Sequence, residues 1–166
     1  GGWTQMGAHL DGDAERDQNG YAVALSADGT VVAMGAAWSD GQGRGSETGH
    51  ARVYEWSGTE WTPKGAVIVG EAQGDRCGHS VALSDDGTVL AVGAETNDGG
   101  AANGGHVRVY EWSGTEWTPK GADLDGEIAS SRMGRTVALS GDGTIVLAGA
   151  HAGNNMGYRS HERRVA

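Results

Sequence analysis

Fifteen residues, Arg52-Val-Tyr-Glu-Trp-Ser-Gly-Thr-Glu-Trp-Thr-Pro-Lys-Gly-Ala66, recur without a change as residues 108–122, which lie 56 positions further along the chain. Other short signals keep nearly the same spacing. They are the Trp-Thr pairs that begin at Trp3, Trp61 and Trp117 and the Asp-Gly pairs that begin at Asp28, Asp86 and Asp142. A fixed period of this kind is the sequence signature of solenoids, propellers and arrays. Every other feature of the chain is therefore interpreted as part of a repeat.

Two predicted strands flank the Asp-Gly pair in each copy. The segment before the pair is short, apolar and partly β-branched, as strands are, and it covers residues 20–26, 78–84 and 134–140. The segment after the pair is a continuous apolar run, which indicates a strand covered on both faces, and it covers residues 31–36, 89–94 and 145–150. The Asp-Gly pair itself predicts a type I′ hairpin turn, because that turn needs positive φ at both central residues.

A third and a fourth strand follow a polar, Gly-rich loop. Residues 51–56 and 107–112 alternate as a strand does, and a Ser-Gly turn leads into residues 60–62 and 116–118. A proline follows the last segment in each copy, and proline in a sheet is tolerated mainly at an edge. Each repeat is therefore predicted to be a four-stranded antiparallel meander with its fourth strand outermost. We expect four repeated tryptophans to pack between repeats: Trp56, Trp61, Trp112 and Trp117.

Four strands cannot bury both of their faces alone, so the copies must stack as the WD-like blades of a β-propeller do. The predicted fold is all-β, and residues 1–150 form the repeats. They comprise an outer strand at 3–10, a blade at 20–68, a second blade at 78–124 and a partial blade at 134–150. Propellers close with about four to eight blades, so we expect an incomplete or open propeller fragment of about two and a half to three blades. Residues 151–166 are an atypical C-terminal tail, either a truncated or frame-shifted end or a cap.

Composition excludes several classes of partner. The formal net charge of -10 argues against binding to nucleic acid or to an anionic membrane surface. No apolar run approaches the roughly 20 residues of a membrane-spanning helix, so we expect no membrane insertion. Cys77 is the single cysteine, which rules out an internal disulfide. No nucleophile elbow, phosphate loop, zinc spacing or catalytic triad is present, so the sequence predicts that the chain is not an enzyme.

The repeated unit Gly-Tyr/His-x-Val-Ala-Leu-Ser-x-Asp-Gly-Thr-x-Val/Leu-Ala-x-Gly-Ala, followed by Gly-His-x-Arg-Val-Tyr, resembles the FG-GAP repeat of integrin α subunits and related extracellular propellers. The resemblance implies a cell-adhesion or protein-binding role at the cell surface or outside the cell. The chain departs from the family at the Phe position, which holds Asn19, Cys77 or Met133, and at the Pro of Gly-Ala-Pro, which holds Ala37, Glu95 or His151. The family's Ca²⁺ loop between the first and second strands has no counterpart here, so that site is not carried over.

One carboxylate cluster is a candidate metal site. It comprises Asp11, Asp13, Glu15 and Asp17, in the connection that leads into the first blade. Acidic residues spaced by two offer several oxygens to one Ca²⁺, which takes six to eight oxygen ligands. The alternative is a solvated turn whose side chains cap their own backbone. No other cofactor is expected.

The loops at one end of the blades are the candidate ligand-binding face. In a propeller the connections between strands two and three and those between blades emerge on the same face, and in integrin-like propellers that face binds ligands. The candidate residues there are Asp17, Asp40, Asp75, Asn97 and Asp98. Rigid scaffolds position functional loops in this way. The alternative is that these loops are only permissive linkers.

The predicted function is a noncatalytic interaction or adhesion-type module, part of a larger propeller that binds a protein or glycan ligand through its loop face. Self-association through exposed blade edges is a further expectation. Two alternatives remain open at this point: an accessory propeller of a larger enzyme, and a structural polymer of stacked repeats.

Overall fold

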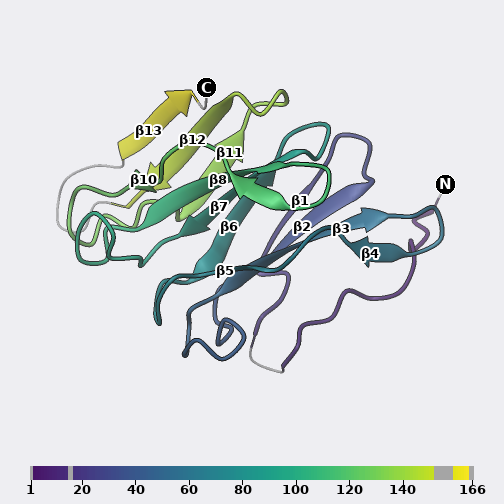
Figure 1. Cartoon of the computed structure of the whole chain (residues 1–166), viewed down its shortest axis with the longest axis horizontal. Coiled ribbons are helices and arrows are strands. Elements are labelled where there is room, and N and C mark those ends of the chain that lie inside the picture. The colour runs from purple at the N-terminus through teal and green to yellow at the C-terminus, as the bar shows by residue number, and fades with distance from the viewer. Residues whose placement is uncertain (1, 15–16, 152–158, 165–166) are drawn as a thin grey trace.

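The computed structural model describes residues 2–14, 17–151 and 159–164, and within these ranges the regular structure is all β. The strands form three antiparallel sheets, which lie side by side and do not close on one another (Figure 1). We call them blades 1, 2 and 3, in chain order. The predicted all-β architecture of stacked blades is confirmed.

Blades 1 and 2 share one topology. Blade 1 comprises β1 Ala22–Leu25, β2 Val31–Ala36, β3 His50–Trp56, β4 Trp61–Pro63 and β5 Ile68–Val69. Blade 2 comprises β6 Cys77–Leu83, β7 Val89–Ala94, β8 His106–Trp112, β9 Trp117–Pro119 and β10 Leu124–Asp125. In both, the short fourth and fifth strands pair with different parts of the third. The fourth strand is at the edge as predicted, whereas the fifth was not predicted because it is only two residues long.

The hairpin turn between the first two strands differs from the type I′ prediction. Gly29 has a positive φ of 72°, but the φ of Asp28 is not positive. The Gly29 amide donates to the Ser26 carbonyl over 3.0 Å. The Asp28 carboxylate accepts bonds from the Ser26 hydroxyl (2.7 Å) and the Thr30 amide (2.9 Å). These bonds favour a type I turn followed by glycine in the left-handed region.

Residues 3–10 form no strand, so the predicted outer strand is wrong. Trp3 occupies the repeat position of Trp61, which pairs with the third strand of its own blade. A third strand that could pair with Trp3 is not among the described residues. The segment instead packs along blade 1, where the Trp61 indole N–H donates to the Met6 carbonyl over 3.0 Å. Trp117 makes the same bond to Lys64 at 2.8 Å, which confirms the predicted packing of these tryptophans between repeats.

The C-terminal tail contains a strand that the sequence analysis missed. Blade 3 comprises β11 Thr136–Leu139, β12 Ile145–Ala150 and β13 Arg159–Arg164. β13 pairs with β12 along its whole length, from Ala150 opposite Arg159 to Ile145 opposite Arg164. A strand edge offers backbone N–H and C=O groups that any extended segment can pair with, apolar or not. The partial blade therefore continues beyond residue 150, into the predicted tail.

The core lies between the blades. One cluster joins blades 1 and 2 through residues such as Val53 and Leu90, and a second joins blades 2 and 3 through residues such as Val107 and Val146. Blade 2 is consequently covered on both faces. The outer face of blade 1 is not: Val23 is 63% exposed, although its repeat counterpart in blade 2 is buried.

Candidate functional site

The β2–β3 and β7–β8 connections lie against the entries to the following blades, because backbone hydrogen bonds join them. The Cys77 amide, at the entry to blade 2, donates to the Thr48 carbonyl in the β2–β3 connection over 3.0 Å. The Met133 amide, at the entry to blade 3, donates to the Gly104 carbonyl over 2.7 Å. Each blade entry is therefore fixed against the loop of the preceding blade.

Asp17 and Asp75, two of the predicted ligand residues, hold the connections between blades. Asp17 is buried and accepts a bond from the Ala14 amide at 3.2 Å. Asp75 is also buried, and it accepts bonds from the Ala72 amide at 2.9 Å and from the Asn97 side chain at 3.0 Å. Both carboxylates cap turns of their own loops.

The other three predicted ligand residues make similar local bonds. Asp40 accepts a bond from the Gly43 amide, and Asp98 accepts one from the Asn103 amide. Asn97, which is buried, accepts a bond from the Gly99 amide at 2.7 Å. All five predicted residues thus shape the loops on which they lie.

The predicted calcium ligands do not converge in the part of the chain that the structure describes. Asp13 pairs with the Arg52 guanidinium, Asp17 caps its turn, and Asp11 is exposed. Glu15 lies outside the described residues. Within the described ranges, no group of potential metal ligands includes these residues.

A different set of residues meets at the start of the first strands, and we call it the mouth cluster: Tyr21, Trp38, Arg76, His79 and Glu95. Tyr21 and His79 occupy the same repeat position, and so do Ala37 and Glu95. The cluster therefore forms where nearly identical repeats differ from one another. That difference was visible in the sequence as departures from the repeat, but sequence reasoning had interpreted it only as divergence from a family pattern.

Aromatic rings form one side of the mouth cluster. The Tyr21 and Trp38 ring centroids lie 4.3 Å apart in an edge-on arrangement, and the His79 ring is 5.1 Å from that of Tyr21. Arg76 lies over the Trp38 ring, with its guanidinium carbon 5.7 Å from the centroid. Tyr21 is 47% exposed, so the ring group meets solvent.

Glu95 is the buried anion of the cluster. Its Oε1 atom lies 3.3 Å from Arg76 Nη1 and 3.3 Å from His79 Nε2, and Arg132 Nη1 lies 4.0 Å from Oε2. The Oε2 atom is buried and has no hydrogen-bond partner. A second carboxylate, that of Glu47, binds Arg76 at 2.7 Å. Two carboxylates thus fix the guanidinium against Trp38.

Histidine protonation in the cluster follows from its neighbours. His79 Nδ1 donates to the Arg135 carbonyl at 3.2 Å, which leaves Nε2 to accept from the Tyr21 hydroxyl at 3.4 Å. Burial lowers the pKa of His79, while the nearby Glu95 charge acts in the opposite direction.

The residue directly before each blade entry has a left-handed backbone conformation. Gln18, Arg76 and Arg132 share one repeat position, directly before each blade entry, and all three have a left-handed backbone with φ of 51°, 57° and 51°. Non-glycine residues rarely take this conformation, and it persists where surrounding contacts fix it. Here the bonds between the loops and blade entries supply those contacts.

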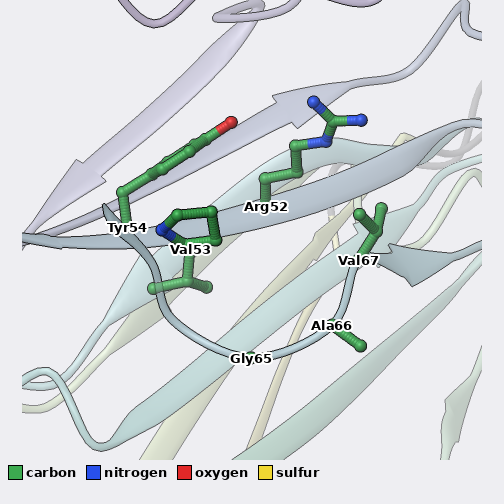
Figure 2. A pocket seen from close by; sticks show the side chains of 7 residues that line it. Arg52, Val53, Tyr54, Gly65, Ala66 and Val67 are labelled. Atoms are coloured by element: carbon green, nitrogen blue, oxygen red, sulfur yellow. The ribbon is translucent and has the colours of Figure 1, made fainter. Parts of the chain in front are cut away.

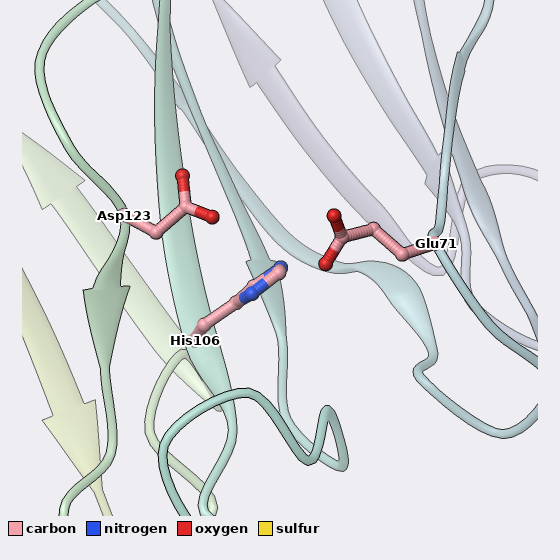
Figure 3. A group of neighbouring side chains, drawn as sticks. All are labelled: Glu71, His106 and Asp123. Atoms are coloured by element: carbon pink, nitrogen blue, oxygen red, sulfur yellow. The ribbon is translucent and has the colours of Figure 1, made fainter.

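Glu71, His106 and Asp123 bring potential metal ligands together elsewhere, between the blade 1–2 connection and blade 2 (Figure 3). The Arg108 guanidinium already occupies this group: Nη2 donates to Glu71 Oε1 at 2.6 Å, and both Nε and Nη2 donate to Asp123 Oδ2, at 2.8 and 2.6 Å. Hydrogen bonds to these two carboxylates raise the pKa of Arg108 against the effect of burial. The two carboxylates are thus neutralised by an arginine, and the set does not fit a metal ion.

Comparisons with known proteins extend the fold assignment. No family model matches the chain, and no curated protein matches it. Among solved structures, a hydrazine synthase of Kuenenia stuttgartiensis aligns with 87% of this chain and 33% of its own length, at a TM-score of 0.52 and 16% identity. A prolyl endopeptidase aligns with 86% of this chain and 20% of its own, at a TM-score of 0.52 and 18% identity.

Both solved structures contain β-propeller domains. The chain is built of β-propeller blades. At such low identity the likeness shows the fold alone. The chain also spans a third or less of the length of these proteins. In addition, no helix in the described residues is long and apolar enough to cross a membrane.

Proposed function

We propose that this chain is a noncatalytic binding module of a larger β-propeller, and that it holds an acidic protein or glycan ligand at the mouth cluster. The observation that carries the proposal is the buried Glu95 carboxylate, around which Arg76 and His79 gather beside two aromatic rings. Trp, Tyr and Arg are the residues that most often dominate binding energy at interfaces. Aromatic rings also provide stacking surfaces for a ligand.

Local charge favours an acidic ligand. The chain carries 12 Lys and Arg against 22 Asp and Glu, so an arginine-rich spot is an exception on its surface. Arg76 is already bound by Glu47 and Glu95, but Arg132 Nη1 lies 4.0 Å from Glu95 and Arg135 is exposed at the repeat position of His79. Guanidinium groups bind carboxylate and sulfate groups in a bidentate way. Opposite charge on the ligand would also speed its association.

The proposal of a noncatalytic role rests on how the two titratable groups of the cluster are used. The Glu95 Oε1 atom is bound to Arg76, and the Oε2 atom is buried away from solvent. His79 has both ring nitrogens engaged, by the Arg135 carbonyl and the Tyr21 hydroxyl. Neither group is free to exchange a proton with a substrate.

The exposed outer face of blade 1 supports membership in a larger propeller. Val23 and Leu25 are 63% and 61% exposed there, while Val81, the counterpart of Val23, is 8% exposed against blade 1. Another blade, from the same polypeptide or from a second copy, would cover this face in the way that blade 1 covers blade 2. Sedimentation of the purified chain separates a monomer from ring-forming or fibrous assemblies.

A binding screen tests the proposal directly. The chain is applied to an array of neutral and acidic glycans and to a panel of acidic and neutral peptides, and affinities of the hits are measured by calorimetry. We expect Arg76→Gln and Trp38→Ala each to weaken binding by about tenfold or more, which corresponds to about 1.4 kcal/mol. Arg44→Gln is the matched control. Arg44 is exposed on the β2–β3 connection, which also carries Trp38, but it lies outside the mouth cluster. Equal losses for Arg44→Gln and Arg76→Gln, or preference for neutral ligands, would contradict the proposal.

A further inference from the structure

A small cavity lies in blade 1 on one side of β3. Its volume is about 100 Å³, and it is lined by Arg52, Val53, Tyr54, Pro63 and residues 65–67. Figure 2 shows Arg52 and Tyr54 projecting from β3 to the same side, with residues 65–67 passing beside them. Pro63, Gly65 and Ala66 are exposed, so the cavity is reached from solvent through this loop.

The Arg52 side chain has an unsatisfied donor. Its guanidinium pairs with Asp13, but the Nε atom is buried and has no hydrogen-bond partner. A buried N–H without an acceptor is costly, more so on a charged group. His50, two residues away on the same side of β3, is 1% exposed and likewise has an unpartnered nitrogen, Nε2.

Blade 2 shows what satisfies the arginine Nε–H group. Arg108 is the repeat counterpart of Arg52, and its Nε atom donates to Asp123 Oδ2 at 2.8 Å. Asp123 corresponds to Val67 in blade 1, which offers no acceptor. Blade 2 therefore contains a carboxylate that blade 1 lacks. In blade 1 Val67 stands at that position, and it lines the cavity.

We propose that the Arg52 cavity binds a carboxylate group from outside the chain, in the position that Asp123 occupies in blade 2. The bound carboxylate would accept a hydrogen bond from Arg52 Nε–H. The Arg52 guanidinium would then be bound by two carboxylates, that of the ligand and that of Asp13. Blade 2 demonstrates that this arrangement is compatible with the fold, since Arg108 holds both Glu71 and Asp123. In blade 2 the His106 ring lies within 4.8 Å of the Asp123 carboxylate, so His50 would adjoin the bound group.

This site is independent of the mouth cluster and goes beyond the proposed function. The carboxylate has two sources, a small organic acid or an acidic side chain of a protein. A cavity of this size admits a group of only a few atoms, so either source would insert just its carboxylate and the adjoining methylene. The affinity for a single carboxylate is expected to be weak, of about millimolar dissociation constant.

The test follows the arginine Nε–Hε signals by NMR while sodium acetate, or an acetylated and amidated glutamate, is added against sodium chloride at equal ionic strength. We expect a saturable shift of the Arg52 signal and none of the Arg108 signal. Acetate binding more tightly indicates a small acid, and the glutamate mimic binding more tightly indicates a protein side chain. If neither probe shifts the Arg52 signal beyond the chloride control, the proposal is overturned.

The two blades provide reciprocal variants. Val67→Asp places the missing carboxylate in the chain and is expected to weaken probe binding at Arg52 by about tenfold or more. Asp123→Val removes it from blade 2 and is expected to create a second titrating signal, from Arg108. Val67→Asn, which supplies a neutral acceptor, replaces Val67→Asp if that variant does not fold. Unchanged binding at Arg52 in the Val67 variants, or no new response from Arg108, would contradict the proposal.

Discussion

Blades 1 and 2 contain the same fifteen residues, yet the arginine that opens this stretch has different surroundings in each. Arg108 is held by two carboxylates, and Arg52 by one. The difference originates directly after the identical stretch, where Val67 in blade 1 stands at the position of Asp123 in blade 2. The identical residues therefore form the same strand in both blades. The residues around that strand decide whether the arginine has all its hydrogen-bond partners within the protein or has a donor left for a ligand.

The two blades also differ in how they are covered. Blade 2 lies between two neighbours and contributes to both core clusters, whereas blade 1 has one covered face and one exposed face. The same valine is thus a core residue in one blade and a surface residue in the other. This contrast predicts unequal responses to identical substitutions.

The largest expected effect is from Val81→Ala in blade 2. Val81 is 8% exposed in the core between blades 1 and 2, so its truncation is expected to lower the free energy of unfolding by about 2 kcal/mol. Val23→Ala is the matched variant at the counterpart position, 63% exposed, and is expected to change stability by less than about 0.5 kcal/mol. Urea denaturation of both variants measures the difference. Equal losses would show that the outer face of blade 1 is covered in solution, as in a self-associated form.

The next effect concerns the arginines. Asp123→Val leaves Arg108 Nε without an acceptor and is expected to destabilise the chain by about 1 to 2 kcal/mol. The reciprocal Val67→Asp supplies an acceptor to Arg52 and is expected to leave stability unchanged or to raise it. Denaturant midpoints of the two variants and of the double exchange measure these changes. Destabilisation by both single variants to the same extent would show that the two arginines are not in corresponding environments.

Much of the fold was predictable because the repeat determined it. Three copies in register located the first two strands of all three blades and the third strand of blades 1 and 2, and the edge prolines located the fourth strand. The misses have physical causes. Residues 3–10 look like a fourth strand, but no third strand that could pair with them is among the described residues. β13 pairs through its backbone, which leaves no apolar pattern to detect. In the turn, the Asp28 carboxylate bonds decide between turn types that the Asp-Gly pair alone does not distinguish.

The candidate site was less predictable, because the sequence shows where acidic residues lie but not which groups their carboxylates contact. Asp17 and Asp75 cap turns of their own loops. An aspartate that caps a turn looks the same in the sequence as one that binds a ligand. Glu95, in contrast, was noted only as a departure from the family pattern. Its importance depends on Arg76 and His79 meeting it from other elements, and no spacing in the sequence indicates that convergence.

A smaller effect is expected from Trp117→Phe, which removes the indole N–H bond to the Lys64 carbonyl. This bond is partly buried, and its loss is expected to cost about 1 kcal/mol. Trp61→Phe removes the corresponding bond to the Met6 carbonyl, which is exposed, so a smaller loss is expected. Thermal denaturation followed by circular dichroism compares the two. A larger loss for Trp61→Phe would show that residues 3–10 contribute more to blade 1 than their exposure indicates.

The smallest effect concerns a feature that all three blades share, the Asp-Gly turn. Hydrogen bonds from Ser140 and Thr144 lower the pKa of Asp142 to about 2, and equivalent bonds lower the pKa of Asp28 and of Asp86. Because each folded pKa lies below the unfolded value of about 3.9, the bonds stabilise the fold above that value, and the stabilisation is lost as the pH falls toward 2. Asp142→Asn is expected to reduce the acid-dependent fall in stability between pH 4 and pH 2, as measured by urea denaturation at several pH values. Asp98→Asn is the control, since Asp98 lies in a loop whose sequence differs between copies; an equal reduction in both variants would mean that the shared turns have no special part in acid unfolding.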